Sequence, residues 1–106
     1  DNLNTLFRIA EETLKAELAA GTNDIDLARD AAQQANRLTK GKDPEVLSQL
    51  AQIALLQGDP ASAIQFQTDA IGAMDPEFRE QRMAEYEETL RGYERQKRDP
   101  NRRTAP

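Results

Sequence analysis

Residues 58–77 of this 106-residue chain read GDPASAIQFQTDAIGAMDPE, and this stretch predicts a short, closely packed helix. The Asp59-Pro60 pair predicts its start, because aspartate accepts hydrogen bonds from free backbone N–H groups and proline has the φ of a first helical turn. Ala63 and Ala70 are seven residues apart, so they lie on one face of that helix. A face that offers only methyl groups predicts close contact with another helix.

The same signal recurs along the chain. Asp-Pro pairs at 43–44, 59–60 and 75–76 predict the starts of three helices. Upstream, apolar residues spaced by three and four predict two more helices, over 4–20 and 24–39. Alternating β-branched residues, the mark of a strand, are absent from the sequence. The chain is therefore predicted to be all-α, with about five helices.

The second and the fourth predicted helices belong to a repeat. A shift of 35 residues superposes Ala28 on Ala63 and Ala35 on Ala70. The chain therefore divides into two helical hairpins and a closing helix, which form a single domain over residues 1–97. The predicted ranges are 4–39 and 43–74 for the hairpins and 76–97 for the closing helix.

The second hairpin, PEVLSQLAQIALLQGDPASAIQFQTDAIGAMDP, resembles the tetratricopeptide repeat (TPR), a helical hairpin of about 34 residues. The matching positions are Leu47, Leu50, Ala51, Gly58, Ala63 and Ala70. The departures are Ala54 and Gln67, where the family favours aromatic residues, and Pro76, about one residue late. The first hairpin matches only at Gly21, Ala28 and Ala35. The resemblance implies two stacked hairpins with a capping helix, arranged as a right-handed α-solenoid.

The composition lacks two residue types that are common in catalytic sites. The chain has no cysteine and no histidine, so disulfides, thiolate metal sites and the common neutral-pH base are excluded. Asp24, Asp26 and Asp30 do not form an EF-hand loop, because Arg29 and Ala35 stand where that loop needs glycine and glutamate. No phosphate loop or nucleophile motif occurs. We expect no enzymatic activity, no cofactor and no metal.

Charge is distributed unevenly. The chain has a net charge of −5, which argues against binding to duplex nucleic acid. Five basic and two acidic residues within 94–106 give that end +3, which leaves −8 for residues 1–93. The final segment, 98–106, lacks apolar periodicity and is predicted to be a disordered basic tail. No apolar run has the length of a membrane span, so no membrane partner is expected.

The resemblance implies a non-enzymatic protein-protein interaction module, a scaffold or adaptor that binds a peptide or a partner domain. TPR ligands lie on the concave face made by the first helix of each hairpin. That implies partner-binding roles for Glu11, Lys15, Leu18, Ser48, Gln52 and Leu55. Some family members clamp a peptide carboxylate with Asn, Lys and Arg, but Ser48, Gln49 and Gln52 here predict no such clamp. A glutamine-rich groove suits a peptide held by amide hydrogen bonds, and a plain solvated surface is the alternative.

Two other hypotheses follow from the sequence. The chain is similar in style to TPR segments attached to bacterial multidomain proteins, so it could be an accessory or dimerisation domain of a larger enzyme, for example a thioredoxin-like one. Its first residue is Asp1 rather than methionine, which favours an excised domain or processed product. Alternatively, a homodimer could form through Phe7 and Leu14 or through the apolar stripe of the last helix. Tyr86 and Tyr93 in that stripe are interpreted as packing residues rather than a stacking platform.

Overall fold

A computed structural model describes residues 2–20 and 25–98 of the chain. Over these ranges the protein is all-α, as predicted, with five helices and no strand. The helices are α1 (Asn2–Ala20), α2 (Ile25–Leu38), α3 (Pro44–Leu56), α4 (Pro60–Gly72) and α5 (Pro76–Arg98). Gly21 and Asp24, at the boundary between the helices predicted over 4–20 and 24–39, lie outside the described residues, and so does the predicted tail beyond Arg98.

The three Asp-Pro pairs begin helices as predicted. The Asp43 carboxylate accepts hydrogen bonds from the backbone N–H groups of Glu45 and Val46, at 2.9 and 3.4 Å. Further along, Asp59 and Asp75 cap α4 and α5 in the same way, with bonds of 3.1 and 2.8 Å from backbone N–H groups. Each helix start is thus fixed locally, by one side chain that satisfies otherwise free donors.

The helix ends use left-handed residues. Gly58 follows α3 with φ +81°, and the N–H of Asp59 reaches back to the Ala54 carbonyl at 2.9 Å, which makes a Schellman motif. After α2 the equivalent position is occupied by Lys40, with φ +57°. The bond from the Gly41 N–H to the Asn36 carbonyl, 2.9 Å, completes the same motif there. A lysine therefore holds a conformation that glycine adopts at much lower cost.

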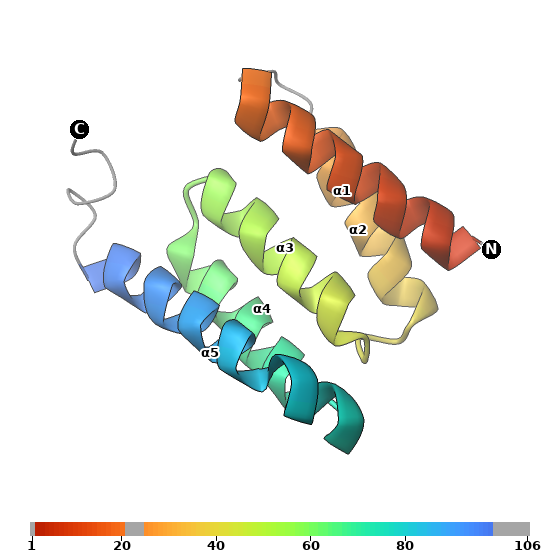
Figure 1. The fold of residues 1–106 in the computed structure, drawn as a ribbon. Helices are drawn as coiled ribbons and strands as arrows, with labels where there is room; N and C mark the ends of the chain where they lie inside the picture. Colours follow the sequence, from red (N-terminus) through yellow and green to blue (C-terminus); the bar gives the residue numbers. More distant parts are fainter. Residues whose placement is uncertain (1, 21–24, 99–106) are drawn as a thin grey trace.

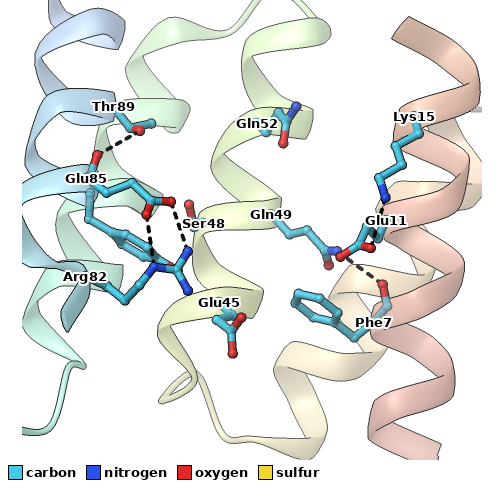
Figure 2. A pocket seen from close by; sticks show the side chains of 11 residues that line it. Phe7, Glu11, Lys15, Glu45, Ser48, Gln49, Gln52, Arg82, Glu85 and Thr89 are labelled. Carbon is cyan, nitrogen blue, oxygen red and sulfur yellow. Dashed lines mark hydrogen bonds and ion pairs between the residues drawn. The ribbon is translucent and has the colours of Figure 1, made fainter. Parts of the chain in front are cut away.

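The five helices form two layers (Figure 1). In this view α1, α3 and α5 lie in front, and α2 and α4 lie behind them. Each helix packs against the next one along the chain, and α3 lies between α1 and α5 (Figure 2). The front layer therefore presents side chains from three helices to one side of the molecule.

Small residues let the layers approach closely. Ala28, Ala32 and Ala35 of α2 are fully buried against α1 and α3. In α4, Ala63 and Ala70 are also fully buried, so the packing role predicted for them is confirmed. They lie beneath the large side chains of α5, because Tyr93 packs in the cluster that contains Ala63, and Tyr86 in the cluster that contains Ala70.

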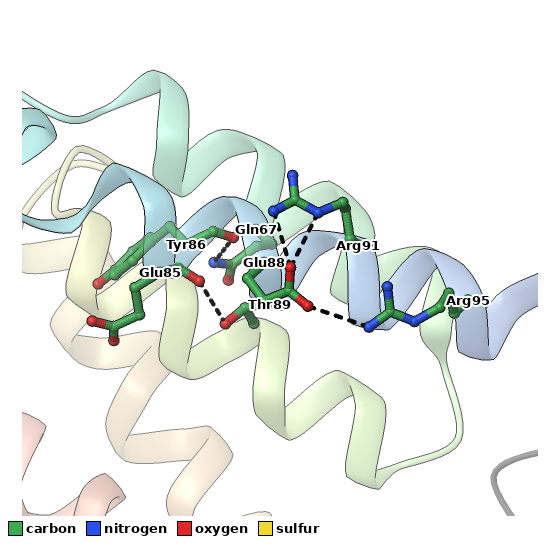
Figure 3. Close-up of polar contacts among 7 residues, drawn as sticks. All are labelled: Gln67, Glu85, Tyr86, Glu88, Thr89, Arg91 and Arg95. Atoms are coloured by element: carbon green, nitrogen blue, oxygen red, sulfur yellow. Dashed lines mark hydrogen bonds and ion pairs between the residues drawn. The ribbon is translucent and has the colours of Figure 1, made fainter.

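A buried glutamine joins three helices. Gln67 of α4 has no solvent-exposed surface. Its Oε1 accepts a hydrogen bond from Ser48 Oγ of α3 at 2.9 Å. Its Nε2 donates to the Tyr86 carbonyl of α5 at 3.2 Å (Figure 3). Because both ends of the amide are satisfied, the polar group fits the core and fixes α3, α4 and α5 in one register.

Candidate functional site

The front layer contains an open pocket of about 310 Å³ (Figure 2). Its right-hand wall in this view is α1, its floor is α3 and its left-hand wall is α5. Eleven residues line it: Phe7, Glu11 and Lys15 from α1, Glu45, Ser48, Gln49 and Gln52 from α3, and Arg82, Glu85, Tyr86 and Thr89 from α5. Most of these side chains are polar or charged, so the pocket is suited to hydrogen bonding.

Four of the six residues assigned a partner-binding role from the sequence line this pocket together. They are Glu11 and Lys15 from α1 and Ser48 and Gln52 from α3. Leu55 does not line it; this side chain packs beside Ala51, Ala63 and Tyr93 in a core cluster between α3, α4 and α5. The side chain of Leu18 lies outside the described part of the structure, as does that of Leu14.

The α3 floor is built by residues one turn apart. Glu45 and Gln49 are four residues apart and share a face, which the neighbouring Ser48 and Gln52 extend. The Ser48 hydroxyl is already committed to Gln67. Gln49 is 7% exposed, and its Nε2 donates to the Phe7 carbonyl of α1 at 3.2 Å. Ser48, which was predicted to bind a partner, and the neighbouring Gln49 thus also tie the floor to adjacent helices.

Gln49 leaves one acceptor without a partner. Its Oε1 is buried and has no hydrogen-bond partner. The orientation of the amide follows from its surroundings, because an exchanged amide would point its oxygen at the Phe7 carbonyl, another acceptor. A buried acceptor without a hydrogen bond lowers the stability of the folded state, and a donor that reached this oxygen in the pocket floor would remove that cost.

The α5 wall is a fixed ion pair on an aromatic support. Arg82 donates Nε and Nη2 to the two carboxylate oxygens of Glu85, at 3.0 and 2.9 Å. The guanidinium carbon lies 5.5 Å from the ring centres of Phe78 and Tyr86, and the two rings meet edge to face at 5.6 Å. The hydrogen bonds to Arg82 lower the pKa of Glu85, and those to Glu85 raise the pKa of Arg82. Both groups remain charged near neutral pH.

The α1 wall is looser. Lys15 Nζ and Glu11 Oε1 are 3.4 Å apart, and their side chains are 69% and 45% exposed. Such exposed pairs one turn apart contribute little to stability. Either side chain can therefore move at small cost when a ligand enters.

Sequence reasoning missed the contribution of α5. Arg82, Glu85 and Thr89 follow a helical spacing of three and four, which would have indicated a shared face. The predicted apolar stripe contains Tyr86 and Tyr93, which are 4% and 8% exposed, and Tyr86 also lines the pocket beside Arg82. That stripe packs against α3 and α4 within the chain, so the interpretation of the tyrosines as packing residues is confirmed.

The pocket offers charges and hydrogen-bonding groups. Among residues 2–20 and 25–98, no three acidic side chains come together in a way that could hold a metal ion. Burial raises the pKa of Tyr86 to about 12, so this hydroxyl stays protonated at neutral pH. Within the described ranges, no helix combines the length and the apolar character needed to cross a membrane.

Comparison of the chain with protein-family models, with curated proteins and with solved structures gave no match.

Proposed function

We propose that the chain is a protein-interaction module of the TPR type, which binds a peptide segment in the pocket between α1, α3 and α5. The observation that carries this proposal is the convergence of Glu11, Lys15, Ser48 and Gln52 in one pocket. These residues come from two helices that are far apart in sequence, and the TPR resemblance assigned them to one concave face. The two-layer arrangement of the helices is the one that stacked hairpins would give (Figure 1).

The chemistry of the pocket supports peptide binding. Gln52 in the α3 floor and Thr89 in the α5 wall offer amide and hydroxyl groups, which suit the backbone N–H and C=O groups of an extended segment. The walls carry charges of both signs, held by Glu11, Lys15, Arg82 and Glu85. A short peptide would therefore bind with its backbone beside Gln52 and Thr89 and with one side chain directed toward the α3 floor.

The test is an amide-resolved NMR titration of the full chain with a pool of random hexapeptides, acetylated and amidated to remove terminal charges. We expect shifts at the backbone amides of Ser48, Gln49 and Gln52. A Gln52→Trp variant should fill the pocket and abolish these shifts. Gln33→Trp is the matched control, because Gln33 is exposed on α2 and does not line the pocket. Shifts that are absent, or that persist in Gln52→Trp, would contradict the proposal.

A second candidate is self-association through the first hairpin. Ile9 of α1 and Leu27 and Leu38 of α2 are 37%, 56% and 55% exposed, so the first hairpin presents large apolar side chains to solvent. A second copy of the chain, or another domain of a larger bacterial enzyme, would bury them. Sedimentation equilibrium tests the homodimer: the native chain should associate, and Leu27→Glu with Leu38→Glu should be monomeric. A native chain that is monomeric at high micromolar concentration would exclude it.

A further inference from the structure

The floor of the pocket carries one acceptor without a hydrogen-bond partner and one carboxylate that belongs to no ion pair of the described residues. Gln49 Oε1 is buried and unpartnered, and Glu45 lies one helical turn before it on the same face of α3. Glu45 lines the pocket, and among the described residues it takes part in none of the ion pairs. The hydrogen bonds to Glu85, and to a smaller degree the charge of Glu45, raise the pKa of Arg82. A ligand that serves both positions must therefore donate hydrogen bonds.

The charge balance of the pocket sets the sign of that ligand. Glu11 is paired with Lys15, and Glu85 is paired with Arg82, so these two pairs contribute no net charge. The carboxylate of Glu45 then leaves the pocket with a net charge of −1. A single positive group would neutralise it.

The shape of the donors favours a guanidinium. Phe7 points from α1 toward α3, where Glu45 and Gln49 lie (Figure 2). A guanidinium is flat, stacks on an aromatic ring and carries five N–H donors in a fixed fork, so it can bond two acceptors a turn apart. The ammonium of lysine is compact and lacks this fork.

We propose that this pocket recognises an arginine side chain of the bound peptide, with the guanidinium between the Glu45 carboxylate and Gln49 Oε1 and its plane against Phe7. The inference rests on the proposed function and names the side chain that the peptide must carry. Of the pocket's own cations, Arg82 is held by both oxygens of Glu85 and by two rings, which keeps it from filling this position. Lys15 is exposed and can withdraw.

The experiment uses three pentapeptides, acetylated and amidated, with the sequence Ala-Ala-X-Ala-Ala. X is arginine, lysine or citrulline, the uncharged analogue of arginine with nearly the same shape. Each is titrated into the full chain and followed by NMR at the side-chain amide of Gln49 and the backbone amides around it. We expect the arginine peptide to bind about tenfold more tightly than the citrulline peptide, because a charged donor strengthens each hydrogen bond.

Substitutions locate the effect. Glu45→Gln should remove the preference for arginine over citrulline, and Gln49→Met should weaken binding of both. Glu77→Gln is the matched control, because Glu77 follows Pro76 in α5 as Glu45 follows Pro44 in α3, yet it does not line the pocket. Both glutamates lie in the first turn of a helix, so the loss of the favourable dipole interaction is the same. Thermal unfolding confirms that each variant is folded.

The outcomes separate this inference from the proposed function. Equal affinity for arginine and citrulline, equal affinity for arginine and lysine, or an unchanged preference in Glu45→Gln would overturn the arginine site. If the random hexapeptide pool still shifts Ser48 and Gln52, peptide binding stands and only the arginine inference fails. If neither the pool nor the arginine peptide shifts these residues, both proposals fail.

Discussion

At the scale of the residue, Lys40 adopts a backbone conformation that is unfavourable for a residue with a side chain. Among the described non-glycine residues it alone has a positive φ, +57°, and it does so to complete the turn between α2 and α3. A side chain in the left-handed region costs roughly 1–2 kcal/mol, and glycine avoids most of this cost.

We therefore expect Lys40→Gly to raise the free energy of unfolding by about 1 kcal/mol, after the greater flexibility of glycine in the unfolded chain is deducted. Urea unfolding measures it. Lys42→Gly is the control, since it removes the same charge two residues later at a position without a positive φ, and it should not stabilise the protein. Equal effects of the two substitutions would show that charge, and not backbone strain, is responsible.

The buried tyrosines predict a limit at high pH. Burial raises the pKa of Tyr86 to about 12 and also raises that of Tyr93 above its ordinary value. A folded-state pKa above the unfolded value means that the stabilisation is complete below pH 10 and is lost as the pH rises toward 12. Ultraviolet titration should show tyrosinate forming only with unfolding, whereas a reversible titration near 10 in the native protein would contradict the buried positions.

At the scale of the element, Gln67 shows how three helices are held together. Replacing it with leucine leaves Ser48 Oγ without its acceptor and removes the bond to the Tyr86 carbonyl. We expect Gln67→Leu to lower the free energy of unfolding by about 1–3 kcal/mol. In the double variant with Ser48→Ala, the combined loss should be smaller than the sum of the two single losses, because the variants share one hydrogen bond.

Gln65→Leu is the control on the same helix. Its side chain is exposed and bonds only to Asp69 one turn away, at 3.0 Å. Exposed substitutions of this kind usually change stability by less than about 0.5 kcal/mol. Chemical denaturation measures the free energy of unfolding of the native chain, the two single variants, the double variant and the control. If the losses from Gln67→Leu and Ser48→Ala are strictly additive, the two side chains do not share a hydrogen bond.

The elements also show what could be predicted from the sequence and why. The starts of α3, α4 and α5 were predictable, because an Asp-Pro pair acts on backbone groups within three residues of itself. The burial of Gln67 was not, since its partners lie 19 residues away on either side and polar side chains are usually exposed. The pocket was predicted only in part. The repeat predicted its residues on α1 and α3, because each is the first helix of a hairpin. Arg82 and Glu85 lie on α5, which belongs to neither hairpin, so the repeat could not predict them.

At the scale of the whole molecule, the proposed stacked arrangement can be tested by lengthening the chain. Residues 44–75 begin at the proline of the Asp-Pro pair at 43–44 and end at the aspartate of the pair at 75–76. A second copy can therefore be inserted between Asp75 and Pro76, and both new junctions remain Asp-Pro pairs. In a repeat protein each unit contacts only its neighbours, so the insertion should be accommodated.

We expect the extended protein to gain helix in proportion to its length and to unfold in one cooperative transition. Circular dichroism measures both. An insertion with the same composition in scrambled order is the control and should add little helix. If the true copy also adds little helix, the five helices form a closed bundle and the solenoid proposal fails.

The alanine-rich packing of α2 affects how fast the first hairpin opens. The buried residues of α2 are all alanines, and methyl groups bury little apolar surface. We therefore expect the first hairpin to be held less firmly than α5, which is anchored by Tyr86 and Tyr93. Native-state hydrogen exchange should then be fastest in the first hairpin. Local opening of the first hairpin would move the α1 wall away from the pocket. The rate of this opening would then set the residence time of a bound peptide.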